Sequence, residues 1–244
     1  MSNHTTHPRN RRAGRAQLPQ SQGQPRRSAP KKPRVAIGTL VLFAAVFFLL
    51  VVSLALSSGA KARLTALREE RALAAQQHQE QLNYYAGMRT KSGVYSIIHR
   101  YAAEYNVNPS LISAVISRES HYDPYAESRV GARGLMQIME DTGSWIASRL
   151  NNKDYSYDHL FDPDLNIRFG TWYLAYLSDY YQGNPVMMAA AYHAGANNVN
   201  LWALKYADDE RYLTVDQIPT EDTKDYVRKV MNAYAVYYEV DQSL

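Results

Sequence analysis

The sequence predicts a mainly α-helical protein in which one membrane-spanning helix precedes a single folded domain. Three observations carry this prediction. Residues 35–56 hold no charge, apolar residues recur at helical spacing through most of residues 93–244, and no alternating strand pattern appears there except around residues 131–138. The chain accordingly divides into four stretches: a disordered basic tail (1–34), a transmembrane helix (35–57), a helical stalk or linker (58–92) and a folded domain (93–244).

The basic character of the chain is confined to its first stretch. Residues 1–34 contain nine of the 27 Lys and Arg residues, no Asp or Glu, and hardly an aliphatic side chain. Such a composition cannot bury enough surface to offset the entropy lost on ordering, so we expect disorder. The rest of the chain holds 18 basic and 23 acidic residues, so the isoelectric point of about 9.1 reflects the tail. This argues against a basic folded domain that binds nucleic acid.

The uncharged segment is long enough to cross a membrane. Its 22 residues would extend roughly 33 Å as a helix, which matches the apolar thickness of a bilayer. Although Ser58-Gly59-Ala60 resembles a cleavage site, signal peptides have shorter apolar cores of about 7–15 residues, so we favour an uncleaved anchor. The bases that precede the segment place the N-terminus in the cytoplasm. We therefore expect a single-pass membrane protein with its folded domain outside the cytoplasm.

The remaining stretches are expected to be helical. Residues 58–92 are rich in helix-forming Ala, Gln, Glu and Arg but do not sustain apolar heptads, which makes a coiled-coil dimer a weak alternative. The folded domain is long enough for one core. A helix is expected around residues 97–102, and Asn108-Pro109 is a typical start for the next one. Further helices are expected near residues 141–150, 164–181, 185–192, 197–206 and 222–240.

Several kinds of chemistry lack support in the sequence. The chain has no cysteine, which excludes disulfides, thiol nucleophiles and Cys-ligated metals. Its seven histidines form no HExxH motif, and the nearest pair, His4 and His7, lies in the polar tail. We expect no metal and no other cofactor.

Glu119 is the strongest candidate for chemistry because it interrupts an apolar pattern. It continues the stripe of Val115 and Ile116, which should face the core, and it lies at the C-terminal end of its expected helix. Burial and the negative end of the helix dipole both raise the pKa of a carboxyl group, as a general acid requires. The alternative is a glutamate at the rim of the stripe that pairs with Arg118 or Arg133.

The segment after Glu119 is polar and turn-rich. Asp123-Pro124 is a turn signal, and Gly131 and Gly134 allow the backbone to bend closely. Gln137 follows between apolar residues. Taken alone, this amide would be a capping or surface group, and the methionines beside it would be core fillers.

Four ordered blocks of sequence resemble those of the soluble-type lytic transglycosylases, the goose-lysozyme-like relatives of lysozyme. They are ISRESHYDPYAESRVGARGLMQIMEDT, LFDPDLNIRFGTWYL, AAYHAGANNVNLW and IPTEDTKDYVRKV, and together they extend from about Val94 to Tyr238. The tail, the span and the stalk carry no such match. The resemblance implies a lysozyme-like α domain behind the membrane anchor, with Glu119 as its catalytic residue.

The implied reaction is cleavage of the β-1,4 bond between N-acetylmuramic acid and N-acetylglucosamine in peptidoglycan, with 1,6-anhydro-muramyl ends as products. One carboxyl group serves as acid and then base. The nearest alternative is a hydrolase (muramidase) acting on the same bond, which needs a second carboxylate such as Asp123, Asp141 or Asp222. A non-catalytic scaffold that binds the wall is the other alternative. The expected partners are glycan strands, the membrane and an unidentified machinery of the cell envelope, with no nucleic acid.

The resemblance also implies substrate-binding residues. Ser128 would lie near the catalytic carboxyl or the sugar, the backbone at Gly134 would line the cleft, and Tyr192 would place its hydroxyl near the reacting centre. Tyr226 would lie close behind, although a core tyrosine with a satisfied hydroxyl suits Tyr226 better than Tyr192. Three methionine or glutamine side chains would shape the sugar subsites: Met136, Gln137 and Met139.

The sequence departs from the family pattern at three positions. His193 stands where the family usually has Asn, and Glu140 stands where Pro follows Met. Asp222 replaces a Glu before Thr and is one methylene shorter. His193 and Asp222 are still expected to lie at the substrate site.

Overall fold

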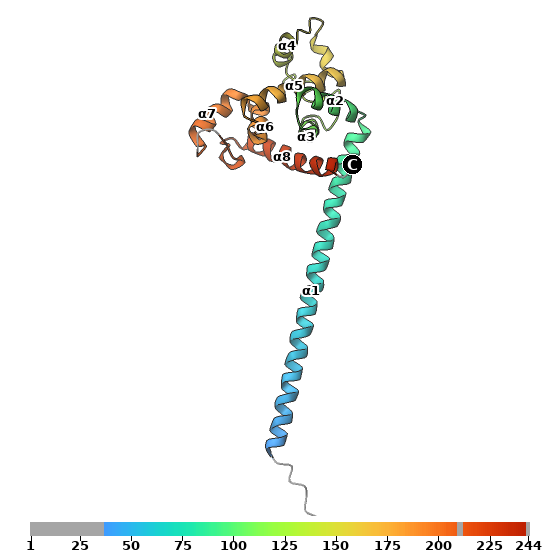
Figure 1. Cartoon of the computed structure of the whole chain (residues 1–244), viewed down its shortest axis with the longest axis vertical. Coiled ribbons are helices and arrows are strands. Elements are labelled where there is room, and N and C mark those ends of the chain that lie inside the picture. Colours follow the sequence, from blue (N-terminus) through green and yellow to red (C-terminus); the bar gives the residue numbers. More distant parts are fainter. Residues whose placement is uncertain (1–36, 209–211, 243–244) are drawn as a thin grey trace, which may run out of the picture. The chain divides into compact units, whose positions relative to one another are not determined.

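The computed structural model describes residues 37–208 and 212–242, so the predicted disordered tail lies outside the described residues. The predicted mainly α-helical class is confirmed (Figure 1). Within the described ranges, extended pairing is limited to two isolated bridges, Glu127 with Arg133 and Arg133 with Ile138. The helices are α1 (Ile37–Lys91), α2 (Tyr95–Tyr105), α3 (Pro109–Glu119), α4 (Glu140–Arg149), α5 (Pro163–Tyr180), α6 (Pro185–Ala194), α7 (Ala196–Tyr206) and α8 (Glu221–Gln242), with two short 3₁₀ turns at Tyr157–Phe161 and Val215–Gln217.

The chain divides into two units, residues 1–63 and 64–244. In the first unit the described residues belong to α1, the one described helix that is long and apolar enough to cross a membrane. Its large apolar side chains between Leu40 and Leu56 are 37–75% exposed, so no described part of the protein covers them. An apolar surface of this kind is stable when a lipid bilayer replaces water around it.

In the second unit, the end of α1 takes part in the core. Tyr85 and Met88 pack against it, and the ring of Tyr85 lies edge-on to Tyr237 at 5.1 Å. Arg89 is only 2% exposed, and its Nη2 lies 2.7 Å from a carboxylate oxygen of Asp241 in α8. Residues near the end of the predicted stalk therefore contribute to the packing of the domain that follows.

Three helices begin with the same local signal. In each, an Asn or Asp side chain accepts hydrogen bonds from backbone N–H groups of the first turn, and proline occupies the first helical position, where no N–H donor is needed. The pairs are Asn108-Pro109, Asp162-Pro163 and Asn184-Pro185.

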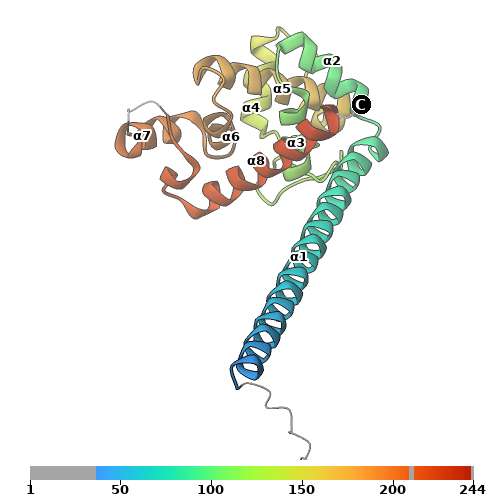
Figure 2. The same ribbon diagram turned by 60° about the horizontal axis from the view of Figure 1, so that its bottom comes forward.

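Helices α3 and α8 form the framework of the second unit and lie side by side (Figure 2). The hydroxyl of Ser110 at the start of α3 donates to Asp241 near the end of α8, at 2.6 Å. The hydroxyl of Tyr226 near the start of α8 donates to Glu119 at the end of α3, also at 2.6 Å. The two helices are therefore antiparallel, and a polar contact marks each end.

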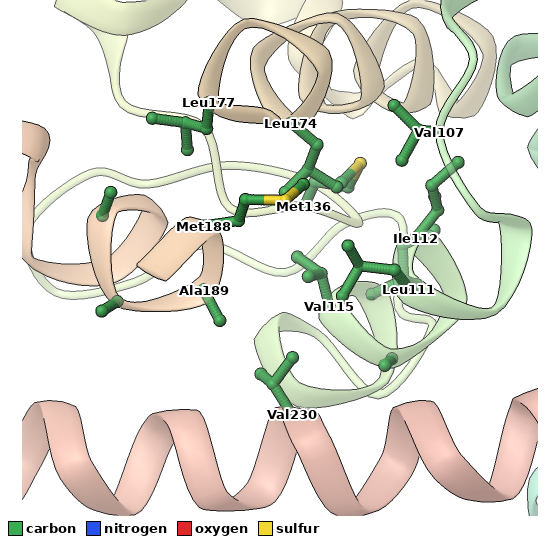
Figure 3. Close-up of a cluster of buried hydrophobic side chains, with 14 of the residues drawn as sticks. Val107, Leu111, Ile112, Val115, Met136, Leu174, Leu177, Met188, Ala189 and Val230 are labelled. Atoms are coloured by element: carbon green, nitrogen blue, oxygen red, sulfur yellow. The ribbon is translucent and has the colours of Figure 1, made fainter. Parts of the chain in front are cut away.

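The core lies between this pair and helices α5 and α6 (Figure 3). Leu111, Ile112 and Val115 of α3 contribute to it, as the apolar stripe of the sequence predicts. The other labelled contributors are Val107, Met136, Leu174, Leu177, Met188, Ala189 and Val230.

Candidate active site

Glu119 is the last residue of α3, and its carboxyl group is partly buried. Oε1 accepts the hydrogen bond from the hydroxyl of Tyr226. Burial raises the pKa of Glu119 to about 6, against smaller lowering effects of the Tyr226 hydrogen bond and the charge of Arg118. The predicted rise in the pKa is confirmed, and burial is its main cause. The carboxyl group therefore carries a proton over part of the range near neutral pH.

The alternative that Glu119 forms an ion pair at the rim of the stripe finds no support in the described part of the chain. Arg133 binds Glu127 at 3.0 Å and Asp158 at 2.8 Å. The guanidinium of Arg118 lies 5.6 Å from the ring centre of Tyr226, and no salt bridge joins it to Glu119 within the described residues. Glu119 therefore lacks the compensating cation that a buried carboxylate usually has.

The hydroxyls of the two tyrosines of the site have different hydrogen-bond partners. Tyr226, which the sequence favours as a core residue, donates directly to Glu119, and the carboxyl group itself satisfies its hydroxyl. Tyr192 instead donates to the backbone carbonyl of Met136 at 2.8 Å. Burial raises the pKa of both hydroxyls, and the charge of Glu119 raises it further, so both lie within the electrostatic reach of Glu119. Sequence alone could not order them because α6 and α8 meet Glu119 only in the folded domain.

One residue that the sequence analysis did not single out holds the loop after α3. The fully buried side chain of Asn166 donates to the carbonyls of Arg133 and Leu160 at 3.0 and 2.7 Å, and it accepts from the amide of Met136 at 2.8 Å. Gly134 has a φ of 74°, and a Cβ there would lie only 2.3 Å from the Asn166 amide nitrogen. The Asn-Ile-x-x-Gly segment at residues 166–170 thus positions the loop, and Gly134 contributes close packing.

The predicted role of the Met136 side chain at a sugar subsite is wrong. Met136 is fully buried, and a Cβ at Gly170 would lie 2.2 Å from its sulfur. Gly170 lies one turn after Asn166 on α5, so the same helix face fixes the backbone and the side chain of Met136. Its contribution to the site is the carbonyl that accepts from Tyr192.

A pocket of about 310 Å³ brings together several of the other predicted residues. Gln137 has a φ of 47°, and its Nε2 donates to the carbonyls of Ala126 and Gly134 at 3.0 Å each. Met139 is 41% exposed at the start of α4. The pocket is lined by Gln137, Ile138, Met139, Thr142, Ile146, Gly170, Tyr173, Ala191, Tyr192, His193, Ala194 and Gly195.

A second pocket of about 510 Å³ continues from the first, because the two share Thr142, Tyr173, Ala194 and Gly195. Trp145 and Tyr176 form an aromatic wall on one side of it, with ring centres 5.2 Å apart. The wall and the polar side chains of Asn197 and Asn198 suit a sugar, which presents both C–H faces and hydroxyls. The combined depression has the polar and apolar mixture expected for a carbohydrate cleft.

Ser128 has a different local environment from the one expected at the carboxyl group. Its Oγ accepts from the amide of Ala132 at 2.9 Å, and its amide donates to the carbonyl of Ala132. These bonds close the turn between the two residues. No hydrogen bond joins Ser128 to Glu119 in the described parts of the chain, so the structure supports a turn-forming role for its hydroxyl.

His193 and Asp222, two of the departures from the family pattern, contact one another. The imidazole stacks on the ring of Tyr226 at 4.4 Å, and its Nε2 lies 3.5 Å from a carboxylate oxygen of Asp222. Nδ1 lies 3.3 Å from the hydroxyl of Thr223. Burial lowers the pKa of His193, opposed by the charge of Asp222, so the neutral imidazole predominates at neutral pH.

The three candidate second carboxylates have other contacts or positions in the described structure. Asp123 accepts from the amide of Tyr125 at 2.9 Å, which is the turn-forming role of this residue type. Asp141 lines the second pocket, and the side chain of Asp222 is 88% exposed beside His193. Within the described residues, the hydrogen-bond partner given for the Glu119 carboxyl group is the Tyr226 hydroxyl, and none of the three aspartates is bonded to it.

Metal ligands do not gather at the site. Across residues 37–208 and 212–242, no three His, Asp or Glu side chains lie close enough together to hold an ion.

Residues 96–214 match the family model described as the transglycosylase SLT domain. This part of the chain is a transglycosylase SLT domain. Helix α8 lies beyond the matched residues, although it carries Tyr226.

Relatives share this domain over part of their length. The chain is 35% identical over 144 residues to the soluble lytic murein transglycosylase of Escherichia coli (strain K12), covering 58% of this chain and 22% of that protein. It is 31% identical over 169 residues to a membrane-bound lytic murein transglycosylase C of Actinobacillus pleuropneumoniae, covering 59% of this chain and 45% of that protein. The chain thus spans less than half of the length of these relatives.

Solved structures confirm the lysozyme-like fold of the SLT domain. The 70-kDa soluble lytic transglycosylase of Escherichia coli matches with a TM-score of 0.56 and 33% identity over 59% of this chain and 24% of that one. An inactive mutant of the lytic transglycosylase Slt from Pseudomonas aeruginosa matches with a TM-score of 0.54 and 30% identity, over the same shares of the two chains.

Proposed function

We propose that this protein is a peptidoglycan lytic transglycosylase that cleaves the β-1,4 bond between N-acetylmuramic acid and N-acetylglucosamine. The observation that carries the proposal is the environment of Glu119, a buried carboxyl group whose pKa is about 6 and which has a neutral hydroxyl as its hydrogen-bond partner. Such a group can both donate and accept a proton near neutral pH. The inactive mutant among the structural relatives replaces a glutamate with glutamine, which agrees with an essential carboxyl group.

The proposed reaction uses this carboxyl group twice. Protonated Glu119 first gives its proton to the glycosidic oxygen, and the bond between that oxygen and C1 of the muramyl residue breaks. The resulting carboxylate then takes the proton from the muramyl 6-hydroxyl while the oxygen of that hydroxyl attacks C1. This attack closes the 1,6-anhydro ring. Glu119 ends the cycle protonated, and no water is consumed.

The neighbouring residues would adjust and orient this group. Tyr226 stabilises the carboxylate formed after the first step, because it donates to Oε1. Tyr192 and Asn166 hold the Met136 backbone from two sides, which fixes the loop that borders the cleft. Gln137, Met139 and His193 line the pocket and would contact the sugars together with the backbone near Gly134, whereas Asp222 would act through His193.

The hydrolase alternative requires a second carboxylate or a held water. A retaining enzyme places the two carboxyl groups about 5–5.5 Å apart and an inverting one about 6.5–9.5 Å apart. Among the described candidates, Asp123 is engaged in its turn and Asp222 lies exposed beside His193, which favours the transglycosylase reaction. A scaffold that only binds the wall would have no use for a buried acid at a helix end.

Product analysis decides between these reactions. Mass spectrometry of digested peptidoglycan should yield muropeptides that end in 1,6-anhydro-muramic acid, lighter by one water than hydrolytic products and resistant to borohydride. Glu119→Gln should lose more than ~10²- to 10⁴-fold of the rate while it still folds and binds glycan, because the residue acts as acid and then as base. Reducing-end muramic acid as the main product would establish the hydrolase, and a Glu119→Gln rate near wild type would remove Glu119 from the mechanism.

We also propose that the chain is anchored by α1 with the SLT domain outside the cytoplasm. Support comes from the apolar length of α1, from nine bases before the span, and from relatives named membrane-bound. The proposed division is a transmembrane helix at residues 35–57, a stalk at 58–92 and a catalytic domain at 93–244. A protease added to wall-stripped cells should remove the domain and spare the tail, whereas protection of the domain would reverse the orientation. A cell-envelope machinery served by the anchor stays a prediction.

A further inference from the structure

A pocket of about 410 Å³ lies apart from the cleft, where the end of α1 meets α3 and α8. Its walls come from three elements of the second unit: Tyr84, Tyr85 and Met88 of α1, Ser117, Arg118 and His121 at the end of α3, and Lys229 and Ala233 of α8. The residues from α1 and α8 lie outside the matched SLT segment.

The titratable lining of this pocket is basic. Arg118, Lys229 and His121 line it, and no Asp or Glu is among the residues that do so. Asp225 lies one turn before Lys229 on α8 and binds the Lys229 ammonium group at 2.7 Å. It therefore offsets one of the two full positive charges of the pocket, which are those of Arg118 and Lys229. The Nε of Arg118 is buried and has no hydrogen-bond partner among the described residues. A buried donor without a partner is costly, and an anion would satisfy it.

The rest of the lining is suited to a peptide. Tyr84 and Tyr85 lie edge to face at 5.5 Å, and Met88 and Ala233 add apolar surface. Such walls accommodate small aliphatic side chains, while the cations would bind a carboxylate. Arg118 is adjacent to Glu119 in sequence, and its guanidinium faces the ring of Tyr226, whose hydroxyl donates to Glu119.

We propose that this pocket binds a carboxylate of the peptides that hang from the glycan strands of peptidoglycan. This inference rests on the proposed function, since it identifies a second part of the same substrate. Arg118 and Lys229 bind the carboxylate, and the tyrosines of α1 contact the peptide beside it. The end of the stalk is then part of substrate recognition as well as a connection to the membrane anchor.

The test uses a small probe and the full chain in phospholipid nanodiscs. N-trifluoroacetyl-Ala-Ala is titrated against the protein, and binding is followed by broadening of its ¹⁹F signal. The peptide with a free carboxylate should bind saturably, and its C-terminal amide should bind about tenfold more weakly, since a charge-assisted hydrogen bond is lost. Because no glycan is cleaved, this result is independent of whether the proposed reaction occurs.

A matched pair of variants locates the site. Lys229→Gln removes a cation of the pocket and should weaken binding of the free-acid peptide about tenfold. Arg228→Gln removes the neighbouring cation, which is bound to Asp216 and does not line the pocket, and should leave binding unchanged. Equal binding of acid and amide, or equal effects of the two variants, would overturn the proposal. Displacement of the probe by inorganic phosphate at equal concentration would also overturn it, because the pocket would then be a general anion site.

Discussion

The antiparallel pair α3 and α8 carries a carboxyl group at each end, and the two groups differ in their partners. At one end, Asp241 accepts from Ser110 and lies beside the guanidinium of the buried Arg89. The rings of Tyr95 and Tyr237 cover that guanidinium at 4.8 and 5.4 Å. At the other end, Glu119 accepts from a neutral tyrosine hydroxyl, and no described cation pairs with it.

This difference separates a carboxylate with a structural role from the carboxyl group that we propose to be reactive. The charge of Asp241 is compensated by the buried guanidinium of Arg89. Removal of either group would leave the other charge without its partner and would lower the stability of the fold. The charge of Glu119 is not compensated in this way, and burial raises its pKa to about 6. A group in the second situation exchanges its proton near neutral pH, which is the property required of an acid that later acts as a base.

The largest effect on stability is expected from breaking the compensated pair. Arg89→Met keeps the length of the side chain and leaves Asp241 without its cation, so it should lower the free energy of unfolding by about 3–5 kcal/mol. Arg228→Met, which breaks the exposed pair with Asp216, is the control and should cost less than about 1 kcal/mol. The free energy of unfolding is measured in urea by tryptophan fluorescence. Equal losses in the two variants would mean that the buried Arg89 pair contributes no more to stability than the exposed Arg228 pair.

Glu119→Gln should stabilise the protein at alkaline pH even as it abolishes activity. The folded-state pKa of Glu119 is raised to about 6, so the folded protein bears the cost of a charged, buried carboxylate above that pH. Below the unfolded-state pKa the group is protonated in both states and the cost disappears. We expect the variant to gain about 1–2 kcal/mol at pH 8 and nothing at pH 4. An equal gain at both pH values would attribute it to packing.

Tyr226→Phe tests the neutral partner of Glu119. The hydrogen bond from Tyr226 favours the carboxylate and lowers the pKa of Glu119, so its removal should raise that pKa further. The alkaline limb of the rate profile should move to higher pH, while the rate at the optimum falls by at most about tenfold. A rate that falls equally at every pH would indicate a role in positioning instead.

The smallest effect is expected from His193→Asn. Burial lowers the pKa of His193, so the unfolded state binds the proton more readily and the folded state loses stability as the pH falls below about 6.5. The asparagine variant should be more stable than the wild type at pH 5, by less than about 1 kcal/mol, and equal to it at pH 8. If His193 also contacts substrate, the rate profiles should differ near neutrality more than the maximal rates do. Identical profiles would assign it a structural role.

The helices of the domain were predictable because their signals are local. Asn108-Pro109 begins α3, and the apolar stripe that follows faces the core as expected. The stripe also identified Glu119 as unusual and gave the correct direction of its pKa shift. Each of these inferences depends on neighbours within two turns of helix, so no knowledge of the fold was needed.

Contacts between distant segments were beyond the same reasoning. Met136 and Met139 are three residues apart and alike in chemistry, yet the first is fully buried and the second is 41% exposed. The difference arises because the Asn166 side chain of α5 binds the Met136 amide, and the Met136 side chain packs closely against Gly170 of the same helix. Arg89 is a comparable case, since a helix-forming sequence gives no sign of a buried charge whose partner lies about 150 residues later.

The sequence by itself determined the helical class, the long apolar helix and the acid at the end of α3, because periodicity and charge are properties of short segments. Only the tertiary structure decided that Tyr226 rather than Tyr192 bonds to Glu119, that Met136 belongs to the core, and that the end of α1 packs against α8. The physical reason is that the pKa of a carboxyl group depends on what excludes water from it and on which charges lie near it. In this protein those groups come from segments more than 100 residues apart in the chain.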